Sequence, residues 1–99
     1  MSTEIAVVAV AQAKPGQEKT VEHAIRPCIA PTRKEEGCHL YTIHSDLDQT
    51  GRFVFIERWA SRAALDAHMK TPHFLTMAKA LEPVLAKPFD VFIARELAD

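Results

Sequence analysis

Short apolar runs alternate with helical apolar stripes along this chain of 99 residues. The β-branched and small residues of Glu4–Gln12 predict a first strand, which a following Pro-Gly step ends. Cys38–Ser45 and Arg52–Trp59 lie on either side of a polar connection and predict an antiparallel hairpin. Asp90–Glu96 predicts a last strand.

The first of two longer stretches with helical spacing follows the first strand. From Gln17, one helix face collects Val21, Ala24, Ile25, Cys28 and Ile29. Pro27 lies inside this helix and removes a backbone hydrogen bond, so a kink or a loosened last turn is expected. Gly37 can adopt the left-handed conformation that ends the helix.

After the hairpin, the pattern predicts a short helix and then a longer one. Ser61 can cap the short helix, which runs to His68, and Thr71-Pro72 provides an N-cap and a first-turn proline for the next. The apolar stripe of the longer helix is Phe74, Met77, Ala78, Leu81 and Leu85. Lys87-Pro88 is expected to stop it.

The predicted order of elements is β-α-β-β-α-β, the split pattern of the ferredoxin-like α+β fold, in one domain over residues 1–99. Such a sheet has helices on one face only. Its strands are nevertheless apolar at both odd and even positions, as Val7 and Val8 or Phe55 and Ile56 show. A lone chain would expose one apolar face, so the pattern predicts a homodimer packed sheet against sheet.

Composition narrows the range of partners. Charged residues make up 25% of the chain, are interspersed and leave a net charge of −1, which is not the basic footprint of a nucleic-acid-binding protein. No apolar run approaches the roughly 20 residues of a membrane span, and no secretion signal is visible. We therefore expect a cytoplasmic protein with no membrane partner, in which Cys28 and Cys38 are reduced thiols rather than a disulfide.

One carboxylate lies among aromatic residues in the third predicted strand. Glu57 shares its strand face with Phe53, Phe55 and Trp59. An ionised carboxylate that is buried without a partner is costly, so a buried Glu57 needs a partner or a proton. His68 follows soon after in the chain and is the expected partner. The alternative is an acid in a surface salt bridge or in solvent.

The histidines do not suggest a metal site. His68 and His73 are five residues apart, whereas two ligands on one helix face need a spacing of four, and no third ligand stands at a metal-like spacing. His44 lies in the second strand, but the hairpin register that decides its face cannot be settled from the pattern. Tyr41 in the same strand is expected in the core, with a partner for its hydroxyl.

Two segments carry a further signal. One is Lys34–Tyr41, and the other runs from Glu57-Arg58-Trp59 through His68 to Thr71-Pro72-His73. Together they resemble the antibiotic biosynthesis monooxygenase family, in particular its quinol monooxygenase branch, over nearly the whole chain. The resemblance implies a dimeric α+β barrel and oxygenation of a small aromatic substrate by O₂ to a quinone, without flavin, haem or metal. The haem-degrading branch has a histidine ligand where this chain has Ala78, so haem is not expected.

The resemblance also implies a catalytic set of His68, Glu57 and Trp59. His68 would be the base or proton shuttle, Glu57 would orient it and raise its basicity, and Trp59 would stack on the substrate ring. The residues expected to bind substrate, some of which are otherwise plain core residues, are Tyr41, Phe55, His44, His73, Phe74 and Met77.

Two other functions stay open. An enzyme of the same fold that acts on a small carbonyl compound, as autoinducer-degrading relatives do, would use the same base for enolisation. It would not need the large aromatic wall that Phe53, Phe55 and Trp59 suggest. A non-catalytic ligand-binding or stress protein could also have kept the fold, because fold alone does not choose among functions.

Overall fold

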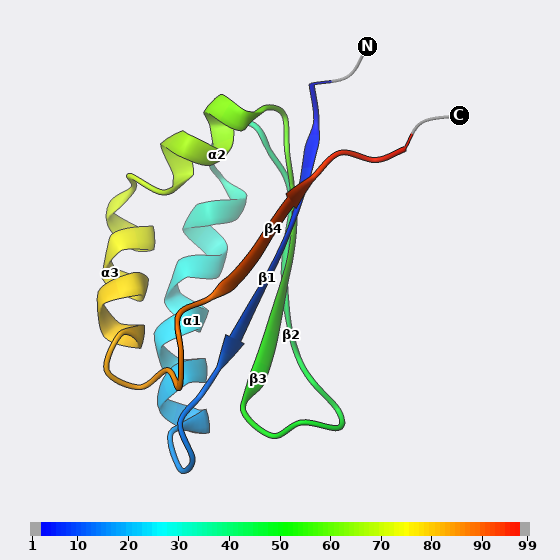
Figure 1. Ribbon diagram of the computed structural model, residues 1–99. Coiled ribbons are helices and arrows are strands. Elements are labelled where there is room, and N and C mark those ends of the chain that lie inside the picture. The colour runs from blue at the N-terminus through cyan, green and yellow to red at the C-terminus, as the bar shows by residue number, and fades with distance from the viewer. Residues whose placement is uncertain (1–2, 98–99) are drawn as a thin grey trace.

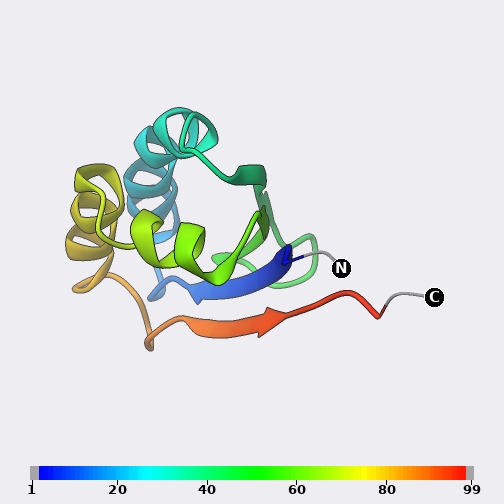
Figure 2. The ribbon, with the colours of Figure 1, turned by 90° about the horizontal axis from the view of Figure 1, so that it is seen from above.

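The computed structural model, shown in Figure 1, describes residues 3–97 and confirms the ferredoxin-like α+β fold. The elements, in chain order, are β1 (Ile5–Gln12), α1 (Glu18–Arg33), β2 (Cys38–Ser45), β3 (Arg52–Trp59), α2 (Arg62–His68), α3 (Pro72–Leu81) and β4 (Asp90–Ala94). The four strands form one antiparallel sheet in the order β2-β3-β1-β4. All three helices lie on one face of this sheet (Figures 1 and 2).

The strand register decides which side chains meet under the helices. Glu57 of β3 pairs with Val7 of β1 on one side and with Tyr41 of β2 on the other, and Val7 in turn pairs with Ile93 of β4. Directly opposed residues point to the same face of a sheet. One row across all four strands therefore places the Glu57 carboxyl and the Tyr41 phenol side by side beneath the helices.

The prolines shape the helices differently from the sequence prediction. α1 continues through Pro27 to Arg33, and the backbone N–H groups of Lys34 and Glu35 then bond to carbonyls three residues back, which is a tightened last turn. The prediction that the second long helix runs to Lys87-Pro88 is wrong. α3 ends at Leu81, because Pro83 has no N–H to donate and its ring crowds the preceding turn.

The C-terminal segment also departs from the prediction in detail. Leu85 does not belong to the α3 stripe but forms an isolated antiparallel bridge with Ala13. β4 ends at Ala94 rather than at Glu96. None of the described helices is long and apolar enough to cross a membrane. Cys28 and Cys38 are both free thiols, as expected.

Gly37 connects α1 to β2 at a point where only glycine fits. Its φ of +85° is left-handed, and an added Cβ would lie 2.8 Å from the Cβ of Ala64. Its carbonyl also accepts a 2.7 Å hydrogen bond from the N–H of Ala60. The α1–β2 connection is therefore held close to the start of α2, and this closeness positions the Glu35 side chain described below.

We expect Gly37→Ala to lower the free energy of unfolding by about 2 to 4 kcal/mol, since it combines left-handed strain with overpacking. Gly16→Ala is the matched control, because Gly16 has a φ of +83° but nothing within 4 Å of an added Cβ. It should cost only the backbone term, about 1 to 2 kcal/mol. Urea denaturation measures both. Equal losses in the two variants would show that the contact with Ala64 does not matter.

Candidate active site

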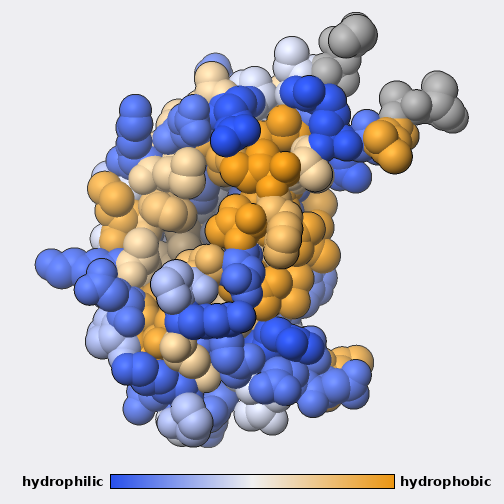
Figure 3. All heavy atoms as spheres, viewed as in Figure 1, coloured by the Kyte–Doolittle hydropathy of each residue, from blue (hydrophilic) through white to orange (hydrophobic). Residues whose placement is uncertain are grey.

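A cavity of about 120 Å³ lies between the sheet and the helices α2 and α3. Its wall is apolar except for Tyr41, Glu57 and His68. The cavity opens beside β4, where Val91 and Ile93 form part of the wall. Figure 3 shows hydrophobic side chains gathered over β4, next to a hollow on the side of the helices. A space of this size and polarity suits a small aromatic molecule with few polar groups.

His68, the last residue of α2, is one of the buried polar groups in the wall. Its side chain is 3% exposed, and its Nδ1 lies 2.7 Å from Oε2 of Glu35. The Trp59 ring packs against the imidazole with centroids 4.7 Å apart and a tilt of 33°. Tyr41 and Phe74 approach the same imidazole edge-on, at 5.7 and 5.1 Å. Together, these contacts fix the orientation of the His68 imidazole.

The second nitrogen of His68 is available for chemistry. Within residues 3–97, the hydrogen bond of His68 through its ring is the one at Nδ1, and no buried side-chain nitrogen or oxygen lacks a partner. Nε2 therefore has access to open space, and His68 lines the cavity. If Nδ1 carries the proton donated to Glu35, Nε2 presents its lone pair to whatever occupies the cavity.

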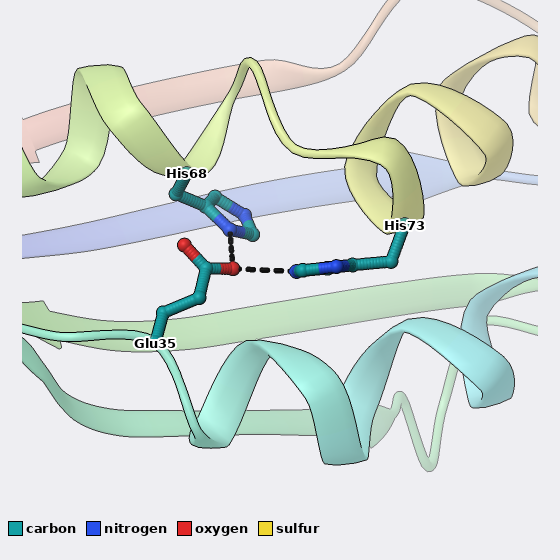
Figure 4. Close-up of side chains that lie close together, drawn as sticks. All are labelled: Glu35, His68 and His73. Atoms are coloured by element: carbon teal, nitrogen blue, oxygen red, sulfur yellow. Dashed lines mark hydrogen bonds and ion pairs between the residues drawn. The ribbon is translucent and has the colours of Figure 1, made fainter.

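Glu35 holds two imidazoles at once, as Figure 4 shows. The same Oε2 atom lies 2.7 Å from Nδ1 of His68 and 2.6 Å from Nε2 of His73. Side-chain exposure rises from 3% at His68 to 13% at Glu35 and 21% at His73. The three residues thus lead from the cavity wall towards the surface.

Burial governs how the groups around the cavity titrate. Desolvation lowers the pKa of His68, although the hydrogen bond and charge of Glu35 act in the opposite direction. Desolvation raises the pKa of Glu57 against the hydrogen bond from Trp59, and it raises the pKa of the Tyr41 phenol. Each shift favours the uncharged form, as expected for polar groups in an apolar wall.

The predicted pairing of Glu57 with His68 is wrong. Glu57 is buried as expected, but its Oε1 accepts a 2.8 Å hydrogen bond from Nε1 of Trp59. The partner of His68 is Glu35, which the sequence prediction missed. Glu35 lies in the turn between α1 and β2, where no periodic pattern marks a residue as inward-facing. The available signal was its place in the segment Lys34–Tyr41, which carries part of the family resemblance.

Three other predicted site residues lie outside the cavity wall. Trp59 was expected to stack on substrate, but it is fully buried and lies behind His68 rather than in the cavity wall. His44 is exposed on the opposite face of the sheet, where it pairs with Val54 and hydrogen-bonds Thr42, so it cannot contact substrate in this cavity. His73 contacts Glu35 and is not part of the wall.

The remaining predicted substrate-binding residues do line the cavity, and they are Tyr41, Phe55, Phe74 and Met77. Phe89, from the segment before β4, joins them and packs edge-on against Phe55 at 5.5 Å. The sequence pattern gave no hint of Phe89, because it precedes the last strand in an irregular stretch. The binding roles of the four predicted residues stay a prediction.

Known proteins share both sequence and fold with this chain. Rv0793 of Mycobacterium tuberculosis is 32% identical over 97 residues, which are 98% of this chain and 95% of that protein. The Escherichia coli protein named probable quinol monooxygenase YgiN is 32% identical over 88 residues, which are 79% of this chain and 85% of the relative.

Solved structures agree over almost the full length. PA3566 from Pseudomonas aeruginosa matches with a TM-score of 0.92 at 35% identity, covering 99% of this chain and 98% of that one. The structure of Rv0793 matches with a TM-score of 0.90 at 31% identity, covering 97% of each chain. The sequence profile of the antibiotic biosynthesis monooxygenase family matches residues 4–80. Because this match spans well over half of the chain, the protein belongs to the antibiotic biosynthesis monooxygenase family.

Proposed function

We propose that the protein is a monooxygenase that oxidises a small phenol or quinol with O₂, without an organic cofactor. The observation that carries this proposal is His68. Its imidazole is held at Nδ1 by the Glu35 carboxylate, is uncharged by virtue of burial, and has Nε2 free beside an apolar cavity. That arrangement is suited to removing a proton from a bound hydroxyl group.

The chemistry follows from the electrons of the substrate. Nε2 of His68 takes the phenolic proton, and the electron-rich phenolate passes one electron to O₂. The two radicals combine at a ring carbon that still bears hydrogen, and the imidazolium of His68 returns its proton to the resulting peroxide anion, which gives a hydroperoxide. Loss of water then leaves a new carbonyl, so one oxygen atom of O₂ enters the quinone and the other leaves as water. An enclosed apolar wall keeps the radical pair together.

Glu35 takes the role that the sequence assigned to Glu57. Its carboxylate stabilises the imidazolium that forms when His68 accepts the proton, as a buried acid does behind a catalytic histidine. His73 lies on the same oxygen atom and is more exposed. It extends the hydrogen-bonded chain from His68 towards solvent.

Tyr41 and Glu57 are placed to position the substrate. Both line the cavity in one row of the sheet. In the uncharged form that burial favours, each has an O–H group that can donate to a ring oxygen. The rings of Phe55, Phe74 and Phe89 form apolar walls for the substrate ring.

The other two functions receive less support from the cavity. Enolisation of a small carbonyl compound could use the same His68, but it gives no reason for three phenylalanine rings around the space. A non-catalytic binding protein would not need a carboxylate behind His68, because withdrawing both His68 and Glu35 from water costs free energy. The Escherichia coli relative, which is named a probable quinol monooxygenase, also favours a quinol.

We also propose that the protein works as a homodimer packed sheet against sheet. On the face without helices, Val8 pairs with Ile56 on one side and with Phe92 on the other. These side chains are 38%, 39% and 61% exposed, so an apolar row crosses three strands. A second copy would cover it. We expect this dimer in the cytoplasm, where reducing conditions keep Cys28 and Cys38 as thiols.

His68→Ala should lower the rate of O₂ consumption with reduced menadione by about 10²- to 10⁴-fold, because the general base is lost. Glu35→Gln should also lose most of the rate, since an amide can donate to Nδ1 and so move the proton of His68 onto Nε2. An oxygen electrode measures the rate in the presence of a chelator, with autoxidation subtracted. His23→Ala, which removes an exposed imidazole of α1, should keep full activity. Unchanged turnover in His68→Ala would show that another group is the base.

Ile56→Asp should give a monomer, because it puts a charge at one end of the apolar row, where the second copy would bury it. Light scattering should show the wild type at twice the 11.0 kDa mass of one chain and the variant at that single mass. Leu47→Asp is the control, since Leu47 is exposed in the β2–β3 connection, away from the row. A wild type with the mass of one chain would contradict the dimer.

Glu57→Gln should change how stability depends on pH. The folded state raises the pKa of Glu57 above its usual value, so the folded protein binds this proton more tightly than the unfolded chain. The wild type therefore loses stability, relative to the variant, as pH rises from below 4.5 through the folded pKa. The amide oxygen of Gln can still accept from Trp59. Thermal unfolding across this pH range measures the difference, and parallel curves would mean that burial does not affect Glu57.

A further inference from the structure

Glu35, His68 and His73 bring together three metal-ligating atoms. Oε2 of Glu35, Nδ1 of His68 and Nε2 of His73 lie within 4.8 Å of one another. They come from the turn after α1, from the end of α2 and from the start of α3 (Figure 4). The prediction from spacing was that these histidines form no metal site. That argument assumed one helix, whereas the chain breaks between the two and turns both imidazoles towards the carboxylate.

The connection between the two histidines is rigid. The Thr71 hydroxyl donates to the carbonyl of His68 at 2.7 Å and accepts from the backbone N–H of Phe74 at 3.3 Å. Pro72 begins α3. His68 is also clamped by aromatic rings, and it is almost completely buried. Ligands whose rotamers are set before the ion arrives are a property of metal sites that bind well.

The charge around these atoms favours a cation. Within residues 3–97, the ion-pair partners of Glu35 are the two imidazoles, and neither lysine nor arginine neutralises it. With both imidazoles uncharged, the three groups carry one net negative charge. In the absence of an ion, the two N–H protons that point at Oε2 fill the place where a cation would sit.

We propose that Glu35, His68 and His73 form a site for a divalent transition-metal ion of the Zn²⁺ class. Two imidazole nitrogens and one carboxylate oxygen are a donor set typical of zinc, with a fourth position left for water. Tetrahedral coordination at about 2.0 to 2.2 Å sets neighbouring ligand atoms roughly 3.3 to 3.5 Å apart, so each nitrogen must move roughly 0.7 Å further from Oε2 than its hydrogen-bonded distance of 2.7 or 2.6 Å. Glu35 lies in a turn and His73 is partly exposed, so both can make this movement.

Metal binding would switch off the proposed base, a consequence that rests on the proposed function. When Nδ1 of His68 coordinates the ion, the proton of the imidazole lies on Nε2. Nε2 then has no lone pair for a phenolic proton. The metal-bound and the catalytic forms of His68 exclude each other, so Zn²⁺ acts as an inhibitor at this site.

The experiment measures Zn²⁺ affinity directly. Metal-free protein competes for Zn²⁺ with a chromophoric chelator, and the wild type should bind one ion per chain. Mutation of a residue that only hydrogen-bonds a metal ligand typically weakens metal affinity by about 10- to 100-fold. Loss of a ligand itself should therefore weaken Zn²⁺ affinity by at least about 100-fold. We expect that loss in His73→Ala and in Glu35→Gln. Circular dichroism checks that each variant is folded, and either variant alone suffices for the comparison.

His39→Ala is the matched control. His39 of β2 forms another imidazole–carboxylate pair, with Glu4, which precedes β1; the pair lies at the surface, across β3. Arg58 also pairs with Glu4 there. Loss of this imidazole should leave Zn²⁺ affinity unchanged. Equal affinity in the wild type and His73→Ala, or loss of affinity in His39→Ala alone, would overturn the proposed site.

The metal site and the proposed function can fail separately. One tight Zn²⁺ per chain, without any turnover of reduced menadione by the metal-free protein, would keep the site and reject the oxygenase. Turnover that continues when Zn²⁺ saturates the site would support the metal site and the oxygenase, but it would reject the proposal that Zn²⁺ inhibits the enzyme. Turnover without tight Zn²⁺ binding would reject the site alone.

Discussion

The carboxylate of Glu35 is shared by two imidazoles from different helices, and this contact organises the half of the molecule that surrounds the cavity. It fixes the end of α2 and the start of α3 over the sheet, and it decides which nitrogen of His68 faces the cavity. Both imidazoles and the carboxylate are largely withdrawn from water, so each needs the others for its hydrogen bonds. The turn at Gly37 and the rigid connection at Thr71 hold this arrangement in place.

The sheet provides the other side of the cavity. Antiparallel pairing places Tyr41, Glu57 and Val7 in one row beneath the helices. Trp59 has a structural role: its indole N–H donates to Glu57, and its ring packs behind His68. The two acids of the site are thereby separated. Glu35 hydrogen-bonds His68, whereas Glu57 lines the cavity. In the proposed function, the base that takes the proton and the donor that holds the substrate therefore come from different parts of the fold.

The cluster of Glu35, His68 and His73 can hold either protons or a metal ion. The atoms that hold the protons of His68 and His73 are also suitable ligands for a transition metal. An enzyme that works by removing a proton with a histidine gains from a carboxylate behind it, and a carboxylate between two histidines inevitably resembles a metal site. Which occupant prevails depends on the concentration of free metal and on how far the three groups can separate.

The sequence by itself determined the order of elements, the antiparallel hairpin and the strand face that Glu57 shares with aromatic residues, whereas the burial of Glu57 was decided by the structure. These features follow from periodicities of two and 3.6 residues and from caps such as Ser61, which act over a few residues. It also identified His68 as a candidate base, through family resemblance. Only the tertiary structure decided that Glu35 holds His68, that Trp59 lies behind it and that His44 faces away. Those outcomes depend on strand register and on which turn approaches which helix end, because contacts between residues 35, 68 and 73 have no local pattern to announce them.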